Sequence, residues 1–175
     1  SENRLEQNPP DQTYNNLVYS PDGGWLAATN GSGLVVAWNL ETGEQRTIRA
    51  ADPIRLIYDD SLAFSPDGVL LAIAYPSDNH GSTSMVELVD FASGELILTL
   101  DHDTENSLSD LAFSPDGTLL ATAAPGKLYL WDTNTGKRLY EGEQATGVIS
   151  LAFDAEGRFI VTGGWDGLLR VWGVR

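Results

Sequence analysis

The stretch Ser114 to Gly136, SPDGTLLATAAPGKLYLWDTNTG, sets the pattern for the rest of the chain. Its first four residues favour a tight turn, because proline fixes φ, aspartate hydrogen-bonds back to the backbone and glycine adopts the left-handed conformation. Two apolar runs follow, residues 119–123 and 127–131, with Pro125-Gly126 between them. We therefore expect two antiparallel strands joined by a hairpin, and a second turn that ends at Gly136.

The same order of turns and strands occurs four times in the 175 residues. The glycines that end the first turn are Gly23, Gly68, Gly117 and Gly157, at spacings of 45, 49 and 40 residues. A strand is expected before each of these glycines and further strands after it, so that each unit forms a four-stranded antiparallel meander. We expect the units at about 14–50, 59–101, 108–142 and 148–175. Because a single sheet cannot bury both of its faces, the units must stack into one domain that spans residues 1–175.

These residues closely resemble the WD-repeat β-propeller family. Ser-Pro-Asp-Gly, Trp-Asp and Thr-Gly recur in a fixed order, as in Trp131-Asp132 and Thr135-Gly136, and the repeat length is about 40–45 residues. The resemblance covers nearly the whole chain. It implies an all-β propeller of four-stranded antiparallel blades, with four blades per chain.

The fourth unit lacks its own last strand, because only three residues follow Trp172. Leu5 stands nine residues before Tyr14, as Leu139 stands nine before Val148, so residues 3–8 fit the missing outer strand. In WD-repeat propellers the N-terminal segment typically completes the last blade, and an unfilled blade exposes an unpaired edge. The residues expected to close the ring are Arg4, Leu5, Glu6, Leu168, Arg170 and Trp172.

Four blades are too few for the ring that the resemblance implies. WD-repeat blades typically close with seven or eight, so four would span about half a circle and leave an apolar sheet face at each end. We expect a homodimer in which two copies exchange residues 3–8 and form an eight-bladed ring. A segment of a longer propeller and a lone four-bladed ring are the alternatives.

The family often carries a hydrogen-bonded set of His, Ser or Thr, Asp and Trp in each blade. The last unit comes nearest, with Thr162, Asp166 and Trp172, while Gln144 stands at the histidine position. His102 lies two residues from the corresponding position of the third unit and is left unassigned. We therefore expect the first three units to be held mainly by packing, and Thr162→Val to destabilise the protein more than Thr122→Val.

The irregular connections gather on one rim, which resembles the surface that WD-repeat propellers use for partners. Specificity usually lies where loops vary on a rigid scaffold. This pattern favours a non-enzymatic scaffold that binds a protein or peptide. Trp165 is either an anchor for that partner or a side chain folded over a neighbouring loop. The candidate partner-binding residues are Trp165, Asp166, His80, Tyr75 and His102.

Composition and net charge narrow the range of possible partners and sites. The formal net charge of −15 argues against nucleic acid and anionic membranes as partners. The absence of cysteine excludes disulfides and thiolate metal sites, and no apolar run approaches the roughly 20 residues of a membrane span. Acidic rim residues can hold Ca²⁺, but without an EF-hand spacing they are better explained as solvated loop side chains. These residues are Asp52, Asp59, Asp60, Asp101, Asp103 and Glu105.

No catalytic constellation is visible, since neither of the two histidines lies in a triad context. We therefore expect no catalytic residue, no metal and no cofactor. The alternatives to a protein-binding scaffold are a small-molecule or sugar-binding propeller, an enzyme, and a chain whose only activity is assembly. The compartment stays open, with the cytoplasm favoured.

Overall fold

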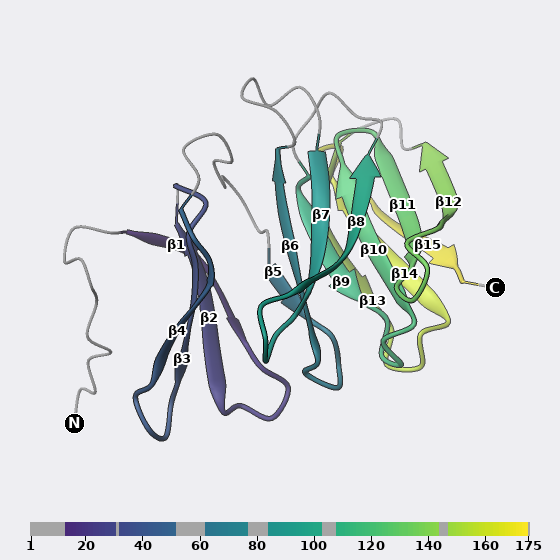
Figure 1. Ribbon diagram of the computed structural model, residues 1–175. Helices are drawn as coiled ribbons and strands as arrows, with labels where there is room; N and C mark the ends of the chain where they lie inside the picture. The colour runs from purple at the N-terminus through teal and green to yellow at the C-terminus, as the bar shows by residue number, and fades with distance from the viewer. Residues whose placement is uncertain are drawn as a thin grey trace.

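The computed structural model describes residues 13–30, 32–51, 62–76, 84–102, 108–143 and 147–174. Within these residues the chain consists of β-strands and turns, without a helix (Figure 1). The strands form four separate antiparallel sheets, numbered here in chain order.

Each sheet is built from consecutive strands. Sheet 1 contains β1 (Tyr14–Tyr19), β2 (Trp25–Asn30), β3 (Val35–Asn39) and β4 (Gln45–Arg49). Sheet 2 contains β5 (Leu62–Phe64), β6 (Leu70–Pro76), β7 (Ser84–Asp90) and β8 (Leu96–His102). Sheet 3 contains β9 (Asp110–Phe113), β10 (Leu119–Ala124), β11 (Lys127–Asp132) and β12 (Arg138–Glu143). Sheet 4 contains β13 (Val148–Phe153), β14 (Phe159–Gly164) and β15 (Leu169–Gly173).

The sheets stack in chain order through their first strands. β1 contacts β5, β5 contacts β9 and β9 contacts β13. Sheet 1 and sheet 4 lie at opposite ends of this stack, so the described part of the chain forms an open array (Figure 1). The expected all-β architecture of stacked antiparallel sheets is thus confirmed. The ring-closing segment 3–8 lies outside the described residues, and the described part of the chain does not close into a ring.

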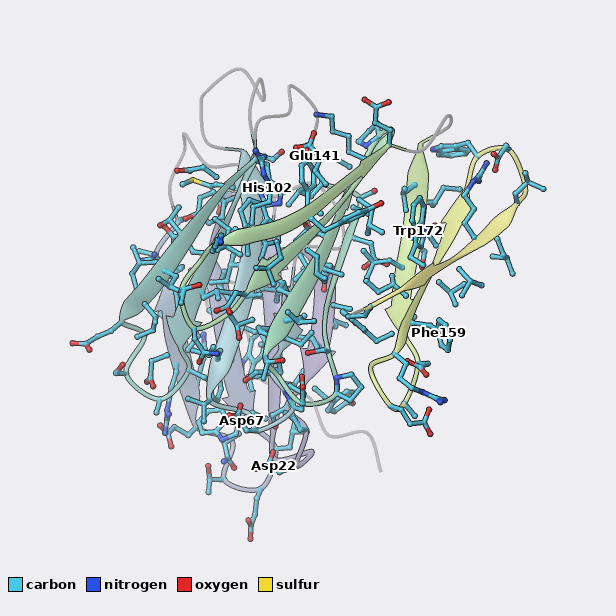
Figure 2. The ribbon with its side chains drawn as sticks, turned by 90° about the vertical axis from the view of Figure 1, so that its right-hand side faces the viewer. Asp22, Asp67, His102, Glu141, Phe159 and Trp172 are labelled. Carbon is cyan, nitrogen blue, oxygen red and sulfur yellow. The ribbon has the colours of Figure 1, made fainter. Side chains whose placement is uncertain are left out.

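The Ser-Pro-Asp-Gly turns all sit at one end of the sheets, as Asp22 and Asp67 show in Figure 2. In the third of these turns, Ser114 Oγ donates to Asp116 Oδ1 at 2.6 Å and accepts from the backbone N–H of Leu119 at 2.9 Å. Gly117 completes the turn with a φ of 74°, in the left-handed region that glycine adopts without strain. The serine hydroxyl, together with backbone N–H donors, lowers the pKa of Asp116 below its ordinary value.

Each sheet has two faces, because alternate residues of a strand point to opposite sides. We call the face that carries Trp38, Trp131 and Trp172 the back face, and the opposite one the front face. The front face of each sheet packs on the back face of the next one. Between sheets 2 and 3, for example, Val86 and Leu88 of the front face meet Leu111 and Phe113 of the back face. The core is therefore three layers between four sheets.

Candidate functional site

Trp165 lies in the turn between β14 and β15, on the rim opposite the Ser-Pro-Asp-Gly turns. Its backbone N–H donates to the carbonyl of Gly147 at 3.1 Å. Its indole lies over the same glycine, because a Cβ built on Gly147 would meet Trp165 Cδ1 at 3.0 Å. The side chain is nevertheless 78% exposed. The indole is thus placed by the neighbouring connection and still presents most of its surface to solvent.

Asp166 fixes this turn. Its carboxylate accepts from Arg170 Nη2 at 2.6 Å and from the backbone N–H of Leu168 at 3.1 Å. The hydrogen bond that Arg170 donates to Asp166 raises the pKa of the arginine above its ordinary value. The pair therefore ties β15 to the turn that carries Trp165.

The polar set expected in sheet 4 is brought together in part. Trp172 Nε1 donates to Thr162 Oγ1 at 3.0 Å, and Thr162 is fully buried. Asp166 of the same expected set pairs with Arg170.

The histidine at the end of β8 belongs to a polar set that the sequence analysis did not assign. His102 is 3% exposed, and its Nε2 lies 2.7 Å from Thr122 Oγ1. Trp131 Nε1 donates to the same oxygen at 3.1 Å. His102 Nδ1 lies 3.1 Å from the carbonyl of Leu100, which can only accept, so Nδ1 carries the proton and Nε2 accepts from the threonine hydroxyl. The hydrogen bonds are therefore donated in one direction, from Trp131 to Thr122 and from Thr122 to His102.

This finding corrects two expectations. The third sheet is held by a buried polar set as well as by packing, and His102 is an internal residue rather than one exposed on the rim. The spacing rule missed it because His102 precedes Leu111 by nine residues, whereas Gln144 precedes Leu151 by seven. Connections of different length shift the histidine along the sequence while its place beside Trp131 is kept, with ring centroids 4.6 Å apart.

The other expected site residues are placed as follows. Tyr75 is buried in the layer between sheets 1 and 2, so it is covered rather than available on the rim. His80 and the ring-closing residues Arg4, Leu5 and Glu6 lie outside the described residues. Leu168 is exposed, and Trp172 is half-buried.

A groove of about 460 Å³ lies between sheets 3 and 4, beside the outer edge of β15. Leu139 and Tyr140 of β12 line one side, and Trp172 and Val174 line the other. In sheets 1 to 3 a fourth strand covers this edge, and in the described part of sheet 4 β15 is the last strand. The groove is therefore the space beside an unpaired strand edge.

Comparison with known protein families identifies the same repeat in two segments of the chain. Residues 94–132 and 136–173 fit the family model described as WD domain, G-beta repeat. The matched residues are two WD repeats. The recurring Trp131 and Trp172, each bonded to a threonine of the neighbouring strand, lie within the matched residues.

Similar WD-repeat proteins cover part of the chain. Transducin beta-like protein 3 of Rattus norvegicus is 36% identical over 92 residues, which are 51% of this chain and 12% of that protein. The protein of the same name from Mus musculus is 35% identical over 92 residues. The antiviral protein SKI8 of Saccharomyces cerevisiae is 33% identical over 115 residues, 66% of this chain and 21% of that protein. The chain thus spans a small part of these relatives' length.

The two end sheets of this WD-repeat chain expose apolar residues. On the front face of sheet 4, Leu169 is 78% and Val171 is 65% exposed, and Phe159 lies at the border of the sheet (Figure 2). The residue of sheet 3 in the same register as Leu169 is Leu128, which opposes Ala123 as Leu169 opposes Gly163. Leu128 is 1% exposed because sheet 4 covers it. The front face of sheet 4 therefore has the composition of an interface without a covering sheet.

Clustered metal ligands and membrane-length helices are both absent from the described part of the chain. No group of three or more His, Cys, Asp or Glu side chains there is arranged to hold a metal ion. Likewise, the described residues contain no helix of the length and apolarity that a membrane span needs.

Proposed function

We propose that this WD-repeat chain is a non-enzymatic protein-interaction scaffold with two working surfaces. Its end sheets join it to a second copy, with residues 3–8 exchanged between the copies, so that two chains complete one ring of blades. Its loop rim, around Trp165, binds a protein or peptide. WD-repeat domains generally bind proteins, which supports the second part.

The observation that carries the proposal is the uncovered front face of sheet 4. Burying a Leu, Val or Phe side chain stabilises a complex by about 1.5–3 kcal/mol. Scaled by their exposed fractions, Leu169, Val171 and Phe159 together offer about 4 kcal/mol per face before the entropy of association is subtracted. Two such contacts in one assembly offer about 8 kcal/mol, to which the apolar residues of the opposing surfaces add.

Rim binding is supported by the placement of Trp165. Its contact with Gly147 and the Asp166–Arg170 pair hold the turn, so little conformational entropy is lost when a partner covers the indole. A rigid, exposed tryptophan is a common anchor in protein interfaces. The candidate rim site is therefore Trp165 with its supporting residue Asp166.

Molar mass in solution tests the self-association. Sedimentation equilibrium of the chain should show a mass that rises with concentration to that of two copies. Leu169→Asp should weaken this association at least tenfold, because it places a charge on the proposed contact. Val69→Asp, at an apolar residue that is 50% exposed in a turn of sheet 2, should leave it unchanged. A wild-type chain that stays monomeric up to high micromolar concentration would refute the proposal.

A peptide screen tests the rim. Peptides selected from a displayed random library on the wild-type chain should bind Trp165→Ala at least tenfold more weakly. Ile97→Ala, on the exposed side of β8, is the matched control and should bind normally. Equal binding to both variants would exclude Trp165 as the anchor.

A further inference from the structure

We infer that the surface which covers the front face of sheet 4 is the back face of sheet 1 of a second copy, so that two copies join head to tail. This inference rests on the proposed self-association and names the two faces that meet. The alternative, in which the same face pairs with itself across a two-fold axis, uses only sheet 4.

The internal interfaces all have the same polarity. In each of the three layers, the front face of one sheet meets the back face of the next. A second copy that continues this order meets the front face of sheet 4 with the back face of its own sheet 1. Head-to-tail joining is therefore a fourth instance of an interface that the chain already makes three times.

The back face of sheet 1 is uncovered at the residues which this interface needs. Leu17 and Tyr19 of β1 are 62% and 63% exposed. They oppose Ala28 and Leu26, and Leu26 opposes Trp38, so both lie on the back face. In the other sheets the residues at these two positions insert into the preceding sheet and are covered by it. Those residues are Leu62 and Phe64, Leu111 and Phe113, and Leu151 and Phe153.

Two buried polar atoms on the same face have no hydrogen-bond partner. They are the indole Nε1 of Trp38 and the hydroxyl of Tyr14, whose rings meet edge to face at 5.2 Å. Trp131 and Trp172 donate to a threonine, but the matching position in sheet 1 is Ala28, which has no hydroxyl. A buried polar group without a hydrogen-bond partner destabilises the protein by about 1–3 kcal/mol. This face therefore favours a binding partner that brings a hydrogen-bonding group to Trp38 and Tyr14.

The interface between sheets 2 and 3 shows where such a group comes from. There the preceding sheet supplies His102, from the end of its last strand, to the Thr122–Trp131 pair of the following sheet. A sheet that arrives behind Trp38 in the same orientation brings the end of its fourth strand to the same place, and in the proposed assembly the exchanged residues 3–8 supply that strand to sheet 4. The unpaired atoms of sheet 1 therefore point to a blade as the partner rather than to a flat, purely apolar surface.

Side-chain size also favours unlike faces. At the interface between sheets 3 and 4, the front face presents the small residues Ala121 and Ala123, and the back face fills the space with Leu151 and Phe153. Gly163 of sheet 4 occupies the position that Ala123 holds in sheet 3. On sheet 1, Leu17 and Tyr19 are the bulky counterparts of Leu151 and Phe153. Pairing front with front does not bring Leu17 and Tyr19 to the space beside Gly163, and a void left there loses packing energy.

Two double variants test the inference. The back-face variant carries Leu17→Asp and Tyr19→Asp, and the front-face variant carries Leu169→Asp and Val171→Asp. All four side chains are exposed within one chain, so both variants should fold, which circular dichroism and a cooperative thermal transition check. Each variant alone should self-associate at least tenfold more weakly than the wild-type chain in sedimentation equilibrium.

The mixture of the two variants decides between the arrangements. Mixed at equal concentration, they should regain a two-chain complex, because the intact front face of one variant meets the intact back face of the other. A back-face variant that self-associates like the wild-type chain would overturn the head-to-tail arrangement while leaving the proposed scaffold in place. A mixture that stays monomeric would also overturn it. Failure of the wild-type chain to associate would instead end the proposed self-association itself.

Discussion

The polar set of sheet 3 leads to a stability prediction in which only one oxygen atom matters. Thr122 Oγ1 receives the indole N–H of Trp131 and contacts Nε2 of His102, and all three side chains are less than 5% exposed. Thr122→Val keeps the shape of the side chain and removes this oxygen. Water has no access to replace it, so the partners on both sides lose a hydrogen bond in a buried place.

The magnitude follows from those two partners. Leaving one buried polar group unsatisfied costs about 1–3 kcal/mol, and the substitution leaves two, so we expect a loss of about 2–6 kcal/mol in the free energy of unfolding. This is a large share of the 5–15 kcal/mol that stabilises a typical domain. Thr162→Val should cost less, because the ring of its partner Trp172 is only half-buried and water can reach it. This expected order is the opposite of the one that the sequence alone favoured.

Urea unfolding, followed by circular dichroism, measures these differences. Thr122→Ser is the matched control, because it keeps the hydroxyl and loses only a methyl group, and it should retain most of the stability. If Thr122→Ser is as destabilising as Thr122→Val, packing rather than hydrogen bonding holds the site. If Thr122→Val costs less than about 1 kcal/mol, the polar set contributes little, and the reasoning is refuted.

Three further outcomes are expected. Folding lowers the pKa of Asp116, so the carboxylate stabilises the fold above the pKa that it has in the unfolded chain, and this stabilisation is lost as the pH falls through the lower folded value. The melting temperature of the wild-type chain should therefore decrease below about pH 4. The decrease should be smaller for Asp116→Asn. Gly117→Ala should cost about 1–2 kcal/mol at a φ of 74°, measured by urea unfolding, whereas Gly173→Ala, in open space, should be neutral. Trp165→Ala should change the unfolding free energy by less than about 0.5 kcal/mol, because the indole is mostly exposed; a larger loss would give it a structural role.

The strands and turns were predictable because their signals are local. The strands expected at 119–123 and 127–131 are confirmed as β10 and β11, since short apolar runs between turn residues fit strands that are buried on both faces. The Ser-Pro-Asp-Gly turn carries its own hydrogen bonds within six residues, from Ser114 to Leu119. The repeat itself follows from the same local patterns, and with it the stacking of sheets.

The candidate site was harder to predict, because it depends on which side chains meet across sheets. His102 could not be assigned by counting, since the connection after β8 has its own length and only packing sets the ring beside Trp131. Tyr75 was expected on the rim and is buried between sheets 1 and 2. The exposure of Trp165 was left open by the sequence, since nothing local says whether a turn residue will be covered.

The amino-acid sequence by itself determined the repeat, the antiparallel meanders and the tight turns, because each of these is specified by residues close together in the chain. The tertiary structure decided which faces are covered. Leu128 and Leu169 occupy matching places in two similar sheets, yet one is buried and the other exposed, solely because a sheet follows the first within the described chain. Burial is a property of neighbours in space, and so the surfaces open to a partner emerge only from the packed array.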